Sequence, residues 1–134
     1  MIFVGIDWAD KEHEVCVLDQ DGTELAHFRI PHTRHGLETL KKQLLRYVTS
    51  PEEAPCFLET SQGLLIQFLL EAGFPVYPLN PKVVDYRRKP SGAKSDTIDA
   101  RLLADIGRSD LRRLRRLNPD SELIQELNVN DHDN

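Results

Sequence analysis

The sequence predicts one α/β domain, built on a mixed five-stranded sheet with helices packed on its faces. Its 134 residues suffice for one domain, and 40% hydrophobic with 29% charged residues is typical of a globular chain. Short apolar runs with tight links fill the first 30 residues, whereas helical and strand-like patterns alternate after them. A meander followed by alternating helices and strands favours a mixed sheet over an all-α or all-β fold.

Three strands are expected first, at residues 1–6, 14–18 and 23–30. The first is a continuous apolar run, and the third alternates apolar with polar side chains. Between the second and third lies a turn in which Gly22 can adopt a positive φ. Because the links are so short, the three strands are expected to pair as an antiparallel meander.

A helix is expected next. Its apolar face has a 3.6-residue period and consists of Leu37, Leu40, Leu44, Leu45 and Val48. The Ser50-Pro51 pair is expected to end this helix, because proline cannot continue it. Residues 55–58 then form a short buried strand that ends at Glu59.

Another helix is expected over about residues 62–72, where Thr60 or Ser61 supplies the N-cap and Gly73 ends it. Residues 74–79 are the fifth strand, and their two prolines favour a place at the sheet edge.

The last helix is expected after a connector rich in proline, lysine and arginine at residues 80–94. It starts after Ser95 and runs to about Ile106, with Gly107 as its end. The element order is thus βββαβαβα, with the first, fourth and fifth strands parallel. This is the strand order of a ribonuclease H-like fold.

Composition and motifs exclude several classes of protein. No apolar stretch approaches the roughly 20 residues of a membrane span, and no signal peptide is recognisable, so a cytoplasmic protein is expected. Cys16 and Cys56 lack zinc-finger spacing and are expected to be buried free thiols. The five histidines lack metal-ligand spacing and are expected in surface or turn roles, and Trp8 beside Asp7 is expected to be a packing residue.

Charge is unevenly distributed along the chain. Residues 81–116 hold 11 Lys/Arg against 5 Asp/Glu, although the whole chain has a net charge of −5. A basic block of this kind is compatible with a phosphate-backbone partner, and equally with a solvated helix face.

Four acidic residues occupy positions that suggest metal-dependent chemistry. Asp7 and Glu59 each follow a strand that should be buried, and Asp96 and Asp99 are expected on one face of the last helix, at i and i+3. Carboxylates that meet at strand ends repel one another unless a cation lies between them, and Mg²⁺ prefers such oxygen ligands. Two such ions can act on a phosphodiester. We therefore expect the carboxyl groups of Asp7, Glu59 and Asp99 to converge on one pocket.

Three motifs together resemble one family. They are GIDWADKEHEVCVLD, LETSQG and NPKVVDYRRKPSGAKSDTIDARLLADIGR, within a resemblance that covers about residues 2–127. The family is the DEDD transposases of bacterial insertion sequences, which includes Piv-type DNA invertases and bridge-RNA-guided recombinases. Its N-terminal domain is RuvC-like and has the ribonuclease H fold.

The resemblance implies a catalytic role for the four acids. It assigns the metal-binding DEDD tetrad to Asp7, Glu59, Asp96 and Asp99, with Mg²⁺ or Mn²⁺ as cofactor. It also implies a nucleic-acid contact, with DNA or a structured guide RNA, through the basic connector residues Lys82, Arg87, Arg88, Lys89 and Lys94. The full-length family is expected to form homo-oligomers.

The same resemblance divides the chain into a RuvC-like DEDD catalytic domain at residues 1–107 and a basic, then acidic, stub at residues 108–134. Family members continue into a second domain with a nucleophilic serine, so this chain is expected to be a truncated or excised N-terminal domain, inactive alone in full recombination. Three alternatives remain open: a non-catalytic remnant or dimerisation module, a RuvC-like nuclease or junction resolvase, and an actin-like sugar kinase.

Overall fold

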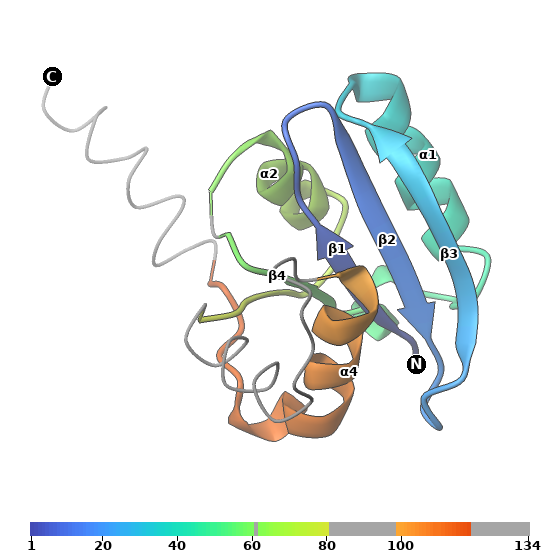
Figure 1. The fold of residues 1–134 in the computed structure, drawn as a ribbon, viewed down its shortest axis with the longest axis vertical. Helices are drawn as coiled ribbons and strands as arrows, with labels where there is room; N and C mark the ends of the chain where they lie inside the picture. Colours follow the sequence, from blue (N-terminus) through green and yellow to red (C-terminus); the bar gives the residue numbers. More distant parts are fainter. Residues whose placement is uncertain (61, 81–98, 119–134) are drawn as a thin grey trace, which may run out of the picture.

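The computed structural model describes residues 1–60, 62–80 and 99–118 of the chain. Five strands form one mixed sheet in the order β3-β2-β1-β4-β5 (Figure 1). The strands are β1 (Phe3–Asp7), β2 (Glu12–Leu18), β3 (Glu24–Pro31), β4 (Cys56–Leu58) and β5 (Val76–Pro78). The helices are α1 (Arg34–Leu44), α2 (Leu64–Glu71) and α4 (Ala100–Asp110), with short 3₁₀ turns η1 (Pro51–Glu53) and η3 (Leu111–Arg113).

The pairing of the strands confirms the predicted topology. β1, β2 and β3 form an antiparallel meander, whereas β4 and β5 run parallel to β1. β5 lies at the edge of the sheet, as its prolines predicted. The carboxyl ends of β1, β4 and β5 therefore share one edge, where the residues that follow them can meet.

Helices α1 and α2 cover one face of the sheet, and α4 covers the other (Figure 1). The larger core lies under α1 and α2, where Leu40 and Leu69 are completely buried with Val4 and Ile6 of the central strand. The alternation along β1 turns Phe3, Gly5 and Asp7 to the opposite face, toward α4. Asp7 therefore belongs to the α4 side.

Helix α4 lies directly on β1. A Cβ atom added at Gly5 would come within 1.9 Å of the Ala100 carbonyl oxygen and 2.6 Å of the Ala104 nitrogen. Only glycine allows this approach, and the alanines of α4 provide the matching flat face. The contact fixes the first turn of α4 close to the end of β1.

Two boundaries of the first two helices differ from the prediction. α1 ends at Leu44, because the chain turns there before the 3₁₀ turn at Pro51. α2 begins at Leu64 with Gly63 as its N-cap and no side-chain capping bond, and the Thr60 hydroxyl instead donates to the Gln62 carbonyl oxygen. The expected end of α2 at Gly73 is supported by a φ of 94° at that residue.

The last helix was also placed wrongly at both ends. Asp99 is the N-cap of α4 and not a residue within the helix, and the helix continues past Gly107 to Asp110. Gly107 is buried in the helix and faces the Phe57 ring, which a Cβ would meet at 2.3 Å. Glycine serves close packing here, which a sequence pattern cannot distinguish from a helix end.

Candidate active site

Asp7 is the last residue of the central strand β1. Strand register places it directly opposite Glu14 of β2, and alternation turns both side chains to the α4 face. The sequence predicted Asp7 at the end of a buried strand, and the structure places it there with intermediate exposure.

Glu59 follows β4, the parallel neighbour of β1, and lies at the same edge of the sheet. Asp7 and Glu59 line one hollow of about 210 Å³. The other residues around it are Ile6, Trp8, Thr60 and Leu103. Two of the four predicted acids thus share a cavity whose wall is partly apolar.

Asp99 approaches from α4. Its backbone is extended, with φ −105° and ψ 166°, and its Oδ1 accepts a hydrogen bond of 2.8 Å from the Leu102 N–H. This cap occupies one of the two carboxylate oxygens. Because α4 packs so closely on Gly5, the capping residue lies near the end of β1.

The pKa of Asp7 reflects the acidic side chains around it. Partial burial raises the pKa of the Asp7 carboxyl, and the neighbouring Glu14 and Asp99 carboxylates raise it further. Asp7, Glu59 and Asp99 do not form a group whose ligand oxygens all lie within 4.8 Å, as judged over the residues that the structure describes. The acids are therefore neighbours, spaced more widely than the ligands of a single ion.

The remaining predicted site residues fall outside the described part of the chain. These residues are Asp96, Lys82, Arg87, Arg88, Lys89 and Lys94.

The described arginines near and after the end of α4 lie away from the acids. Arg108 lies against Gly22 in the β2–β3 turn, and Arg116 forms an ion pair of 2.6 Å with Glu52, just before β4. Both contacts are at the end of the sheet opposite Asp7. Lys11 and Arg29 are described cations on the acidic side, where they lie around Asp7 and Glu14.

Sequence reasoning missed Glu14 and misjudged Trp8. Glu14 looked like an ordinary strand residue, and only the β1–β2 register shows that it faces Asp7. Trp8 was expected to pack, yet 45% of its surface is exposed at the edge of the hollow, where its ring stacks on His13.

His13 contradicts the surface role expected of the histidines, since it is fully buried. The Ala9 N–H donates to its Nδ1 at 3.1 Å, and its Nε2 lies 2.8 Å from Nδ1 of His32. Because Nδ1 of His13 accepts a hydrogen bond, its Nε2 carries the proton and donates a hydrogen bond to Nδ1 of His32. Burial and the neighbouring His32 lower the pKa of His13 to about 4, so it is neutral at pH 7.

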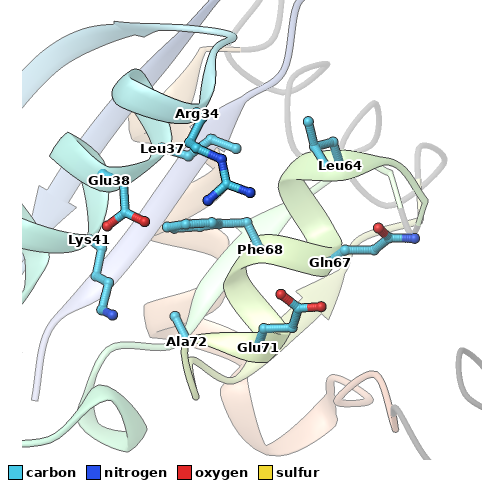
Figure 2. A pocket seen from close by; sticks show the side chains of 9 residues that line it. All are labelled: Arg34, Leu37, Glu38, Lys41, Leu64, Gln67, Phe68, Glu71 and Ala72. Atoms are coloured by element: carbon cyan, nitrogen blue, oxygen red, sulfur yellow. The ribbon is translucent and has the colours of Figure 1, made fainter.

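A second hollow lies on the other face, between α1 and α2 (Figure 2). It has a volume of about 380 Å³, and Phe68 of α2 points toward α1 across it (Figure 2). Arg34, Glu38 and Lys41 of α1 give it mixed charge. It is separated by the sheet from Asp7 and Glu59.

Comparison with known proteins identifies the family of this chain. A family model for DEDD transposases of the IS110 type, described as "Transposase", matches residues 4–132. This chain belongs to that transposase family. The predicted family is thereby confirmed, and the kinase alternative loses its support.

Two curated relatives agree with this assignment. The chain is 38% identical over 132 residues to the "Mini-circle putative transposase for IS117" of Streptomyces coelicolor. It is 32% identical over 130 residues to the "Putative transposase y4uE" of Sinorhizobium fredii. These alignments cover 96% and 93% of this transposase chain, which spans only about a third of each relative, 32% and 36%.

Solved structures confirm the ribonuclease H-like fold. The transposase chain is similar to RuvC of T. thermophilus in complex with a Holliday junction substrate, with a TM-score of 0.57 at 14% identity. The alignment covers 87% of this chain and 99% of that one. A second Thermus thermophilus RuvC structure aligns with a TM-score of 0.52 at 15% identity. Over the described residues, none of the helices has the length and apolar character needed to cross a membrane.

Proposed function

We propose that this chain is the catalytic domain of an insertion-sequence transposase that cleaves and transfers DNA strands with divalent metal ions. Asp7, Glu59, Asp96 and Asp99 would hold Mg²⁺, or Mn²⁺ in its place. The observation that carries the proposal is the raised pKa of Asp7, which faces Glu14 and Asp99 and shares a hollow with Glu59. A fold that gathers these acids at one sheet edge gains from a cation there.

The donor set fits a hard cation. Every proposed ligand is a carboxylate, the type that Mg²⁺ takes together with retained waters. The wide spacing of the described acids leaves room for such waters. When bound, the ions would neutralise charge on the attacked phosphodiester and activate the attacking oxygen.

The chain's own residues would bind and position the nucleic acid. Ile6 and Leu103 wall the hollow and exclude water from one side of it. Trp8, exposed beside the hollow, offers a ring on which a base can stack. We assign the phosphate contacts to the basic connector, as the resemblance implies, whereas Arg116 lies at the opposite end of the sheet.

DNA is the proposed partner, and a structured guide RNA and self-association belong to the same proposal because the resemblance implies them. Complete transposition would need a longer protein, since the chain spans about a third of its curated relatives. Metal binding and contact with DNA are the properties that this chain should retain.

The metal site is tested by titrating Mn²⁺ into the labelled chain and following paramagnetic broadening of amide signals. Broadening should centre on Asp7, Glu59 and Asp99 and spare Arg112 and Arg113, which serve as an internal control at the far end. Asp7→Asn should weaken binding at least tenfold, whereas Glu71→Gln on the other face should not. Uniform weak broadening, or binding unchanged in Asp7→Asn, would refute the proposal.

Contact with DNA can be followed through Trp8, which is the only tryptophan of the chain. Its fluorescence should change on addition of branched DNA, and the affinity should fall as salt is raised. DNA binding that leaves Trp8 emission unaltered would place the nucleic acid elsewhere.

A second candidate is hydrolytic nicking by this domain alone. It is favoured by the alignment with RuvC, which covers 99% of that chain, so a domain of this extent corresponds to a whole RuvC chain. Metal-dependent nicking of a branched DNA, lost in Glu59→Gln, would support it. Binding of DNA without any cleavage in Mg²⁺ or Mn²⁺ would favour a non-catalytic module.

A further inference from the structure

A second group of potential metal ligands lies on the α4 face, where β2 pairs with β3. Register places His27 directly opposite Cys16, and a bulge between Val17 and Leu18 shifts β3 so that Glu24 reaches the same place. The Cys16 thiol lies 3.5 Å from Oε1 of Glu24, and His27 Nδ1 lies 3.5 Å from the same oxygen. One ligand atom from each residue fits within 4.8 Å of the other two.

Both distances to Oε1 of Glu24 match a tetrahedral metal shell. Zinc binds sulfur at about 2.3 Å and nitrogen or oxygen at about 2.0–2.2 Å, so neighbouring ligands of a tetrahedron lie about 3.3–3.6 Å apart. Thiolate and imidazole ligands favour zinc over magnesium, which prefers oxygen alone. Three protein ligands leave one position open to water or to another ligand.

The histidine is already oriented for such a role. Its Nε2 lies 2.6 Å from Oε2 of Glu14, so the carboxylate holds that nitrogen as the protonated one. In the neutral ring, Nδ1 then has its lone pair on the side of Glu24 and Cys16. Hydrogen bonds with Glu14 and Glu24 raise the pKa of His27, so a metal must also displace a proton from the imidazolium. Metal-binding histidines commonly donate their second ring N–H to a carboxylate in this way.

The proposed site is closed by the protein core on the side of Cys16 and open to solvent on the side of Glu24 and His27. Cys16 is fully buried beside Leu18, Ala100 and Ala104, whereas Glu24 and His27 are exposed. Burial raises the pKa of the Cys16 thiol to about 12, so a metal must displace its proton.

Arg101 is the main competitor for a metal at this place. Its guanidinium lies 3.2 Å from Oε1 of Glu24, and Asp99 beside it contributes negative charge near Cys16. The Cys16 thiol and His27 Nδ1 approach this same oxygen, so a metal there must share Glu24 with the arginine or displace it. Removing Arg101 should therefore strengthen metal binding.

We propose that Cys16, Glu24 and His27 form a transition-metal site that takes Zn²⁺, separate from the acidic hollow at Asp7. Glu14 connects the two places, because it orients His27 and faces Asp7 across the β1–β2 pair. The site is independent of the proposed catalytic function and can be tested without DNA.

The test uses Co²⁺ as a spectroscopic stand-in for Zn²⁺ on the full 134-residue chain, reduced and without an affinity tag. One equivalent of Co²⁺ should produce a thiolate-to-metal charge-transfer band, which added Zn²⁺ should abolish by displacement. His27→Gln, an exposed change that leaves the core intact, should weaken Co²⁺ binding at least tenfold. Arg101→Ala should tighten it several-fold.

Controls separate this site from the acidic hollow and from general effects on folding. Cys56→Ala removes the other buried thiol and should leave the band unchanged, whereas Cys16→Ser should remove it. Asp7→Asn should retain the band even where it abolishes Mn²⁺ binding. Absence of a thiolate band at millimolar Co²⁺, or a band that survives His27→Gln at unchanged affinity, would overturn the proposal.

Discussion

The Asp7 carboxylate lies close to two other acidic side chains, Glu14 and Asp99. Its pKa is raised by burial, by Glu14 and by Asp99, so the ionised carboxylate costs stability and the cost is relieved as pH falls through the folded-state pKa. An acidic residue that is repelled by neighbouring carboxylates is typical of a functional site, where function is retained at the expense of stability.

Asp7→Asn should therefore stabilise the metal-free chain by about 1 kcal/mol at pH 7, because the repulsion disappears while the shape remains. Urea unfolding in EDTA measures this, with Glu71→Gln as the control for loss of an exposed acid. Added Mg²⁺ should stabilise the wild type and not Asp7→Asn. A variant less stable than wild type in EDTA would show that Asp7 serves the fold.

His13 makes the stability of the chain depend on pH. Its pKa falls from 6.5 to about 4 in the folded chain, mainly by burial, and a second proton at Nδ1 would face the Ala9 N–H. The neutral form is thus favoured in the folded state. Its contribution is complete above pH 6.5 and is lost as pH falls toward 4.

Between pH 7 and pH 4 the wild type should lose about 3 kcal/mol more stability than His13→Asn, whose side-chain oxygen can still accept from Ala9. Denaturant unfolding at pH 7 and pH 4 measures this loss of stability for each protein separately. Any packing defect caused by the asparagine is present at both pH values and therefore cancels in the difference. Equal losses in the two proteins would mean that His13 does not titrate as described.

Among the elements, α4 has the greatest influence on the candidate site. Gly5→Ala would drive a methyl group into the Ala100 carbonyl and push α4 away from β1. We expect a loss of about 1–3 kcal/mol in stability, typical of overpacking. Affinity for Mn²⁺ should fall as well, because Asp99 moves away from Asp7. Unfolding and Mn²⁺ titration of one sample test both.

Gly107→Ala is the matched comparison at the other end of α4. Its methyl group would meet the Phe57 ring, so it should cost similar stability. The first turn of α4, and Asp99 with it, should stay in place. Equal loss of Mn²⁺ affinity in both glycine variants would indicate a general effect of destabilisation on the site.

Strand order and parallelism followed from the sequence, because short links and apolar runs leave few topologies. Helix ends did not follow, since Gly107 resembles a helix end and only the approach of Phe57 shows otherwise. The Asp7 and Glu59 positions were readable as residues after buried strands. Glu14 and the Cys16–His27 pair were not, because strand register decides which side chains face each other.

At the scale of the whole molecule, the acids and the arginines that follow α4 occupy opposite ends. α4 has 11 residues and so spans about 16 Å, which separates Asp99 from the arginines that follow the helix. The arginines at residues 112–116 therefore lie apart from the acidic hollow. The chain after α4 instead contacts the start of β4, where Arg116 pairs with Glu52.

The segment after α4 closes the sheet edge beside β5. The Leu117 N–H donates to the Val76 carbonyl oxygen at 2.7 Å, and the Leu117 side chain is 5% exposed within the main core. The domain expected at residues 1–107 would lack this contact, whereas residues 1–118 include it. An uncovered edge strand also invites pairing between chains.

Leu117→Ala should therefore cost about 2–4 kcal/mol in stability, because it removes a buried side chain at a sheet edge. Arg116→Ala should cost less than about 1 kcal/mol, since its ion pair with Glu52 is exposed. Denaturant unfolding ranks the two variants, and light scattering at partial unfolding detects edge pairing. Mn²⁺ affinity at Asp7 should be unchanged in both. A Leu117→Ala chain as stable as wild type would restrict the folded unit to the residues before Leu117.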